Sequence, residues 1–419
     1  MMESGGSSLM KVFFISPHFP GEMQHFTRGL AEVGAQVYGV SDVPRGQLPE
    51  QVSRYLCDYL QVPSLLDEDD AAWRIVAAAR AIGPDRVECL WEPCVVLAAR
   101  VRQQLGVAGM GPETAIGFRD KPIMKQRVLA AGLPVPRFSR VRSRAEAHAA
   151  AAAIGYPVCV KPVAGAGSTD THRVGDPDQL RAVLATLDHY AEINLEEFIE
   201  GEEFTYDTIC VDGEPVFESV AQYHPRPLES RQNGWITPAQ VVLRDPYQPA
   251  LLPGIALGRA VLRALGMGTG FSHMEWYKRA DGEAVFGEIA ARSPGGKLVD
   301  QMCLANDIDL YREWARSVCW RSFEAVPQRR YHVAALFKRA EGEGCVVRVD
   351  GLDELRARLG ASLVAAEVLP IGHPRHDWRR TRLSDGHVIV RHPDYATCRA
   401  MERFAIETLR IHASPRGHG

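Results

Sequence analysis

The chain has 419 residues, of which 46% are hydrophobic and 24% charged, a balance typical of a soluble globular protein with two or three domains. The 48 basic and 52 acidic side chains give a formal net charge of −4, and no basic stripe is present, so nucleic acid is not an expected partner. No apolar run reaches the ~18 residues of a membrane span. Residues 1–10 lack the apolar region of a signal peptide, and the nine scattered cysteines contain no Cys-x-x-Cys. We therefore expect a cytoplasmic protein without a membrane partner.

The first 111 residues alternate strand and helix patterns. Apolar runs and helical periodicity predict the following elements: strands at 11–16, 36–41, 87–91 and 107–110, and helices at 22–33, 69–82 and 94–105. The acidic run 67–70 suits the first turn of a helix, so we interpret it as a helix start rather than a metal site. This order predicts a doubly wound α/β domain with ligands at the carboxyl ends of its parallel strands. No G-x-G-x-x-G is present to support a dinucleotide site.

The rest of the chain mixes both element types. A helical stretch runs from Pro112 to Ala131, and strands are predicted at 158–161, 194–199, 203–211 and 215–223. A proline-bearing polar loop spans about 224–238, and a helix covers 248–264. Beyond residue 329, strands and helices alternate over a short α+β region.

Two strand patterns flank Asp281-Gly282, which is a strong signal for a hairpin with a two-residue turn. Such a turn places Glu275 opposite Glu288. Carboxylates on residues whose Cβ atoms are about 5 Å apart repel each other unless a cation lies between them. Mg²⁺ is the obvious candidate because it binds carboxylates and keeps positions for phosphate. The alternative is a surface hairpin whose two acids reach into water.

The same register puts further polar side chains on this face. His273 is expected opposite Ala290, with Arg292 on the same side of the strand. The same reasoning at a second Asp-Gly turn, residues 212–213, places Asp207 opposite Glu218, where we expect no metal.

Two lysines and a glycine-containing loop suggest a phosphate site. Lys121 lies on a predicted helix, and Lys161 ends a strand just before Ala164-Gly165-Ala166-Gly167-Ser168. Small residues let backbone N–H groups approach phosphate oxygens, and a lysine adds charge. Alternatively, the loop is an ordinary turn. An acidic strand at 194–204 follows, and its acids could equally be solvated.

The order of these features resembles the ATP-grasp superfamily of ligases, over about residues 10–410. The resemblance implies a doubly wound N-terminal domain, ATP-grasp domains and a small α+β C-terminal cap. The implied boundaries are 1–111, 112–328 with a lid at about 134–195, and 329–419.

The resemblance also implies roles for single residues. ATP phosphates would be held by Lys121 and Lys161, with the loop at Gly165, Gly167 and Ser168 folded over them. The adenine would contact Glu196, Glu197 and Ile199, and the ribose would contact Glu203. One or two Mg²⁺ ions, with Mn²⁺ as an alternative, would be held by Glu275 and Glu288. Catalytic contacts to the γ-phosphate or acyl phosphate would come from Arg292, His273 and Lys161.

The sequence departs from the superfamily's pattern at two places. Members usually carry Asn two residues after the bridging glutamate, and here that position is Ala290, so a second ion must take water or another oxygen there. The glycine loop lacks the usual Gly after its serine and is followed by 169–173, where His172 or Arg173 could contact phosphate.

These features predict an ADP-forming carboxylate–amine ligase, most similar to L-amino-acid ligases, that acts on small-molecule substrates through an acyl phosphate. Expected substrate contacts are Ser16, His18, Glu92, Arg226, Arg231 and Trp235. A homodimer is common among similar enzymes. One alternative is a bicarbonate-activating, carboxylase-like enzyme, although no biotin-carrier motif is present. Another is a nucleotide-binding module without catalysis, in which Ala290 marks a lost metal.

Overall fold

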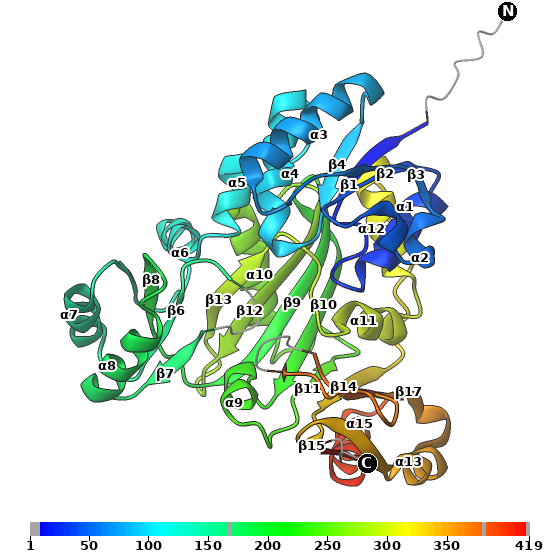
Figure 1. Cartoon of the computed structure of the whole chain (residues 1–419). Helices are drawn as coiled ribbons and strands as arrows, with labels where there is room; N and C mark the ends of the chain where they lie inside the picture. Colours follow the sequence, from blue (N-terminus) through cyan, green and yellow to red (C-terminus); the bar gives the residue numbers. More distant parts are fainter. Residues whose placement is uncertain (1–8, 166–169, 379–382, 416–419) are drawn as a thin grey trace, which may run out of the picture.

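The computed structural model describes residues 9–165, 170–378 and 383–415. The N-terminal region is a parallel four-stranded sheet in the order β3-β2-β1-β4 (Figure 1). Its strands are β1 (Lys11–Ile15), β2 (Gln36–Ser41), β3 (Leu56–Gln61) and β4 (Arg86–Cys89). Its helices are α1 (Met23–Glu32), α2 (Glu50–Ser53), α3 (Glu68–Ile82) and α4 (Val95–Leu105). The doubly wound α/β prediction is confirmed here.

Two details of that region were predicted wrongly. Residues 107–110 form no strand, because Gly106 and Gly109 take positive φ values of 67° and 140° on either side of Val107. The fourth strand is instead β3, an edge strand in which Cys57 and Asp58 are exposed, so it lacks the continuous apolar run of a buried strand.

The predicted helix from Pro112 to Ala131 is broken into α5 (Pro112–Gly117) and α6 (Lys121–Ala130). The break follows from an N-cap, because the Asp120 side chain accepts a hydrogen bond from the backbone N–H of Ile123 at 3.0 Å. Lys121 therefore lies at the first position of α6, close to the loop after β6.

A small antiparallel sheet with its own apolar core follows, and we call it the lid sheet. Its order is β5-β8-β6-β7. The strands are β5 (Phe138–Val141), β6 (Val158–Pro162), β7 (His172–Val174) and β8 (Ile193–Glu197). The helices α7 (Arg144–Ile154) and α8 (Pro177–Thr186) cover it. Figure 1 shows this unit projecting from the side of the molecule.

The largest sheet has eight strands in the order β13-β12-β9-β10-β11-β14-β18-β17, and we call it the central sheet. Its first five strands along the chain are β9 (Glu202–Val211), β10 (Glu214–His224), β11 (Ala239–Val242), β12 (Gly270–Lys278) and β13 (Ala284–Ala290). The helix α10 (Leu252–Leu265) packs on one face, and α11 (Leu298–Asn306) and α12 (Leu310–Trp320) pack on the other, where α12 also contacts α1. The predicted polar loop at 224–238 contains α9 (Pro227–Gln232).

The C-terminal region extends the same sheet. It contributes β14 (His332–Lys338), β17 (Leu363–Val368) and β18 (Gly386–His392), covered by α13 (Leu352–Leu359) and α15 (Tyr395–Thr408). Three short strands, β15 (Glu341–Gly342), β16 (Cys345–Asp350) and β19 (Arg410–Ser414), form a separate small sheet. The region is α+β as predicted, but its main strands continue the central sheet.

The β12–β13 hairpin pairs Glu275 with Glu288, although its turn was predicted wrongly. The loop contains three residues, 280–282, because Arg279 N–H donates to the Glu283 carbonyl at 2.9 Å. That shift of one residue is cancelled by a bulge at Gly287, where a Cβ would lie only 2.7 Å from the Glu275 carbonyl oxygen.

The β9–β10 hairpin shows the opposite outcome. Its two-residue turn is as predicted, but a bulge at Val216 moves the register by one residue. Asp207 therefore pairs with Ser219, and the expected pairing with Glu218 is wrong.

Candidate active site

Two adjoining cavities lie between the N-terminal region, the lid sheet and the central sheet. The larger has a volume of about 630 Å³ and reaches the residues after β4. The smaller has about 60 Å³ and is lined by the lid sheet and the central sheet. Both cavities are lined by Lys121, Gly165, Glu275 and Glu288. These four residues therefore mark the junction between the cavities.

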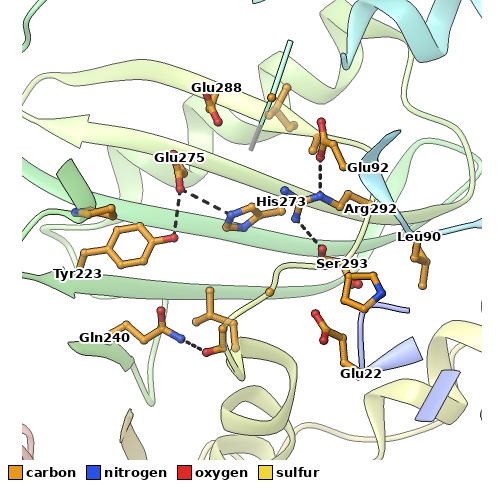
Figure 2. Close-up of a pocket in the computed structure, with 18 of the residues that line it drawn as sticks. Glu22, Leu90, Glu92, Tyr223, Gln240, His273, Glu275, Glu288, Arg292 and Ser293 are labelled. Atoms are coloured by element: carbon orange, nitrogen blue, oxygen red, sulfur yellow. Dashed lines mark hydrogen bonds and ion pairs between the residues drawn. The ribbon is translucent and has the colours of Figure 1, made fainter. Parts of the chain in front are cut away.

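The acid pair lies at this junction. Glu275 and Glu288 are cross-strand partners whose side chains remain 23% and 27% exposed, and Figure 2 shows them beside the cavity. The Tyr223 hydroxyl donates to Oε1 of Glu275 at 3.2 Å. Burial and the neighbouring charge of Glu288 raise the pKa of Glu275. A cation bound between the two carboxylates would remove that repulsion.

The donor set fits a metal that arrives with a nucleotide. Within residues 9–165, 170–378 and 383–415, no cluster of three or more His, Cys, Asp or Glu side chains is arranged to hold a metal ion. Two carboxylates suit Mg²⁺, because Mg²⁺ keeps several waters and takes its remaining oxygens from substrate phosphates. Ala290 lies opposite His273 and offers no oxygen from its side chain.

Three lysines surround the acids from two other elements. Lys121 and Lys161 each place Nζ 3.5 Å from Oε2 of Glu288, and Lys161 also lies 3.0 Å from Glu196. The fully buried Lys125 pairs with Glu196 at 2.8 Å and donates to the Gly287 carbonyl at 2.5 Å. Three lysines thus contact Glu196 and Glu288 in a buried cluster beside Glu275, and they offer cationic partners to an anionic ligand.

This cluster controls the ionisation of its members. Burial acts to raise the pKa of Glu288, but Lys121, Lys161 and Lys125 lower it to about 2. Burial lowers the pKa of Lys125 to about 8, against the attraction of Glu196. Glu288 is therefore ionised at neutral pH and can bind a cation without losing a proton.

A histidine and a buried carboxylate lie beside the acid pair. Nδ1 of His273 is 2.7 Å from Oδ1 of Asp207, which is fully buried, and its Nε2 is 3.8 Å from Oε1 of Glu275. Burial lowers the pKa of His273, but Asp207 outweighs it, so the net shift is upward. The imidazole is thus held by Asp207 on one side and faces Glu275 on the other.

Arg292 closes the cavity on the side of the N-terminal region. Its Nε donates to Glu92, its Nη1 donates to the Ser293 carbonyl at 2.7 Å, and Glu92 also pairs with Arg119 at 3.3 Å (Figure 2). Arg292 and Glu92 come from regions 200 residues apart, and the fold brings them together as an ion pair.

The predicted adenosine contacts line the smaller cavity. Glu196 is buried between Lys125 and Lys161, whereas the Glu197 carboxylate pairs with arginines at the rim. Glu203 is buried, and burial together with the charge of Glu275 raises its pKa to about 7 despite the nearby Arg226. Gly165 accepts a hydrogen bond from Lys121 through its carbonyl, and the predicted contacts at Gly167 and Ser168 lie outside the described residues.

The predicted substrate contacts fall in different places. Glu92 and Arg231 line the larger cavity, whereas Arg226 lines the smaller cavity. Trp235 is 83% exposed and lines neither of these cavities. The loop after β1 reaches the larger cavity through Pro20, Glu22 and Met23 rather than through Ser16 and His18.

Three residues of the site were not predicted from the sequence: Tyr223, which lines the larger cavity, and the buried Lys125 and Asp207, which contact residues that line the cavities. Lys125 could have been found, because it lies four residues after Lys121 and therefore on the same helix face. Asp207 was missed because its contact with His273 comes from the pairing of β9 with β12, two strands that lie far apart in the sequence. Tyr223 carried no signal beyond its place on a strand.

Comparisons with known proteins agree with this geometry. A family profile described as an ATP-grasp domain matches residues 154–301, which include the lid-sheet residues Lys161 and Glu196 and the acid pair. The structure of an L-amino acid ligase from Bacillus licheniformis superposes with a TM-score of 0.76 at 19% identity, covering 96% of this chain and 98% of that one. Residues 154–301 therefore match the ATP-grasp domain family, and nearly the whole chain shares the fold of that ligase.

Related sequences are carbon–nitrogen ligases by name. The chain is 31% identical to the L-arginine-specific L-amino acid ligase of Bacillus subtilis over 225 residues, which is 51% of this chain and 53% of that protein. It is 30% identical to a D-alanine–D-alanine ligase of Cupriavidus necator over 204 residues, 46% of this chain and 60% of the relative. The matches thus span little more than half the length of these curated relatives. No helix among the described residues is both long enough and apolar enough to cross a membrane.

Proposed function

We propose that this protein is an ATP-dependent carboxylate–amine ligase that forms an amide through an acyl phosphate and releases ADP and phosphate. The observation that carries the proposal is the junction of the two cavities, where the acid pair and the three lysines meet a space large enough for small-molecule substrates. Cavities of about 300–1,000 Å³ are typical of small-molecule sites, and the larger cavity lies in that range.

The lysines and the acids would bind different parts of Mg²⁺-ATP. Lys121 and Lys161 would bind phosphate oxygens, which replace Glu288 as their partners. Glu275 and Glu288 would then hold Mg²⁺, which would help to neutralise the negative charge of the transferring phosphoryl group. Glu203 would accept hydrogen bonds from the ribose hydroxyls at the far side of the smaller cavity.

The chemistry takes place in the larger cavity. A substrate carboxylate attacks the γ-phosphorus, the bond to the β-phosphate oxygen breaks, and ADP leaves. The amine then attacks the acyl carbon and phosphate leaves with the bonding electron pair. Arg292, and His273 as a hydrogen-bond donor, would stabilise the negative charge on the phosphoryl and acyl oxygens.

The cavity favours zwitterionic substrates such as amino acids. Its lining includes the Glu22 carboxylate on the N-terminal side and the guanidinium groups of Arg231 and Arg339 on the side of α9 and β14, whereas Glu92 in the same lining is already paired with Arg119 and Arg292. Opposite charges at two ends match an ammonium group at one end and a carboxylate at the other.

The test is release of ADP and phosphate by the full chain with Mg²⁺-ATP and a panel of amino acids, followed by mass spectrometry of the products. We expect ADP and an amide in equal amounts for at least one pair of substrates. Bicarbonate replaces the amino acids in a control reaction. ADP release that requires bicarbonate would favour the carboxylase-like alternative, and nucleotide binding without any turnover would favour the non-catalytic module.

A further inference from the structure

Arg226 occupies an unexpected place. It precedes α9 as its N-cap residue, and its side chain is only 12% exposed. Nε donates to Oε2 of Glu203 at 2.9 Å and Nη1 donates to the Ile199 carbonyl at 2.8 Å. Its guanidinium carbon lies 4.7 Å from the ring centres of both Phe198 and Tyr277. The planar guanidinium group thus lies near two aromatic rings, and the N–H groups at its edge donate hydrogen bonds to Glu203 and Ile199.

These contacts are the ones that a nucleoside would need. Glu203 and Ile199 are the residues expected to meet the ribose and the base, and Phe198 and Tyr277 line the same cavity. Only about 60 Å³ remains there, whereas cavities that hold small molecules have about 300–1,000 Å³. The nucleoside side of the site is therefore largely filled by side chains, and Arg226 contacts every one of these four residues.

We infer that Arg226 is an intramolecular occupant of the nucleoside site, which an incoming nucleoside displaces. The inference rests on the proposed assignment of the smaller cavity to ATP. Displacement exchanges one planar group for another. The base takes the place of the guanidinium beside the rings of Phe198 and Tyr277, and the ribose hydroxyls take its place on Glu203. If the guanidinium is in place nine-tenths of the time, the apparent nucleoside affinity is about tenfold weaker than that of the open site.

Displacement also reaches the larger cavity. Arg226 is joined directly to α9, from which Pro227, Ser230 and Arg231 line that cavity. The opposite end of α9 is held by Arg339, whose Nη1 donates to the carbonyls of Ser230, Asn233 and Ile236 at 3.0–3.3 Å. Releasing Arg226 thus frees the first turn of α9 while its last turn remains fixed. The acceptor side of the site would then reorganise when nucleotide binds.

The test measures equilibrium binding of adenosine, and of ADP with Mg²⁺, to the full-length protein by calorimetry. The variants are Arg226→Ala and, as a second variant that preserves polarity, Arg226→Gln. Adenosine carries no net charge. Removing the Arg226 cation therefore does not change a charge–charge attraction between the protein and this ligand. The matched control is Arg279→Ala, which removes another guanidinium at the rim that pairs with Glu197 and Glu283.

We expect both Arg226 variants to bind adenosine about tenfold more tightly than the wild type, and the control to stay within about twofold. Unchanged or weaker adenosine binding in both folded variants would overturn the inference, because Arg226 would then be a wall of the site rather than its occupant. That result, with ADP still binding the wild type, leaves the proposed function intact. If no variant and no wild-type sample binds ADP or adenosine, the ATP assignment and the inference both fail.

Hydrogen exchange provides the second readout. Peptides covering 225–236 should exchange faster in the wild type when ADP is added, and the Arg226 variants should show the faster exchange without ADP. Exchange in these peptides that ADP leaves unchanged or slows would contradict the release of α9.

Discussion

The β9–β10 and β12–β13 hairpins use their acids in different ways. Both have an Asp-Gly turn sequence and one bulge. Glu218 on β10 is buried and satisfied by the fold, with hydrogen bonds of 2.5–2.7 Å from Arg259, Tyr206 and Tyr247. Glu288 on β13 faces a cavity, and its nearest cations are lysines at 3.5 Å. An acid that the fold already satisfies stabilises the structure, whereas an acid held open beside a cavity indicates a ligand.

The largest effect should come from Glu288. Replacing it with Gln keeps its shape and removes the charge that would hold Mg²⁺, so ADP release should fall by about 10²–10³-fold, as when one electrostatic contact to a transition state is lost. Steady-state ADP release at saturating ATP measures this change. Activity within threefold of the wild type would remove Glu288 from the site.

Glu218 should show the reverse pattern. In Glu218→Gln the charge that pairs with Arg259 is lost and the buried Tyr206 hydroxyl loses its ionised acceptor, so the free energy of unfolding should fall by about 2–3 kcal/mol. Urea unfolding gives the stability, and ADP release at a temperature where the variant is folded should be unchanged. A loss of ADP release in the folded variant would contradict the assignment of Glu218 to stability alone.

The two bulges can be compared directly. Gly287→Ala places a Cβ 2.7 Å from the Glu275 carbonyl oxygen and should shift the acid pair, lowering ADP release roughly tenfold and stability by about 1–3 kcal/mol. Val216→Ala is the matched control, because Val216 is 40% exposed at the other bulge and should cost less than about 1 kcal/mol. Equal effects of both substitutions on ADP release would show that the bulge at Gly287 does not position Glu288.

The smallest effect is a pH dependence of stability. Burial acts to raise the pKa of Glu218, but hydrogen bonds from Arg259, Tyr206 and Tyr247 hold it below the usual 4.5. The stabilisation is therefore present above about pH 4.5 and is lost as the pH falls through the lower pKa of the folded state, at up to about 1.4 kcal/mol per pH unit. The free energies of unfolding of the wild type and of Glu218→Gln, measured between pH 3 and 6, should become more similar as the pH falls. Parallel curves would assign the acid sensitivity to other groups.

Much of the fold was predictable because its periodicity is strong. The parallel N-terminal strand β1 is an almost continuous apolar run and β2 is mostly buried. The helices α3 and α8 begin directly after Asp67 and Asp176, whose side chains cap them. The half-exposed edge strand β3 has no such run and was missed. Residues 107–110 were predicted as a strand because local propensity does not reveal the glycine conformations around them.

The candidate site was predictable only where chemistry lies in short motifs. Glu275 and Glu288 were paired correctly because the error in the turn and the bulge at Gly287 cancel. Asp207 and Lys125 depend on contacts between strands and helices that local patterns do not specify. Arg226 was expected to meet a substrate carboxylate and instead contacts Glu203, since a loop's sequence does not fix which cavity its side chains enter.

The central claim is that the acid pair on β12 and β13 holds a divalent ion together with a nucleotide. Electron paramagnetic resonance of Mn²⁺, titrated into the protein with ADP, measures that ion directly. We expect the wild type and Glu218→Gln to bind Mn²⁺. We expect both Glu275→Gln and Glu288→Gln to bind Mn²⁺ at least tenfold more weakly than the wild type. Mn²⁺ binding that survives both of the latter substitutions would contradict the central claim.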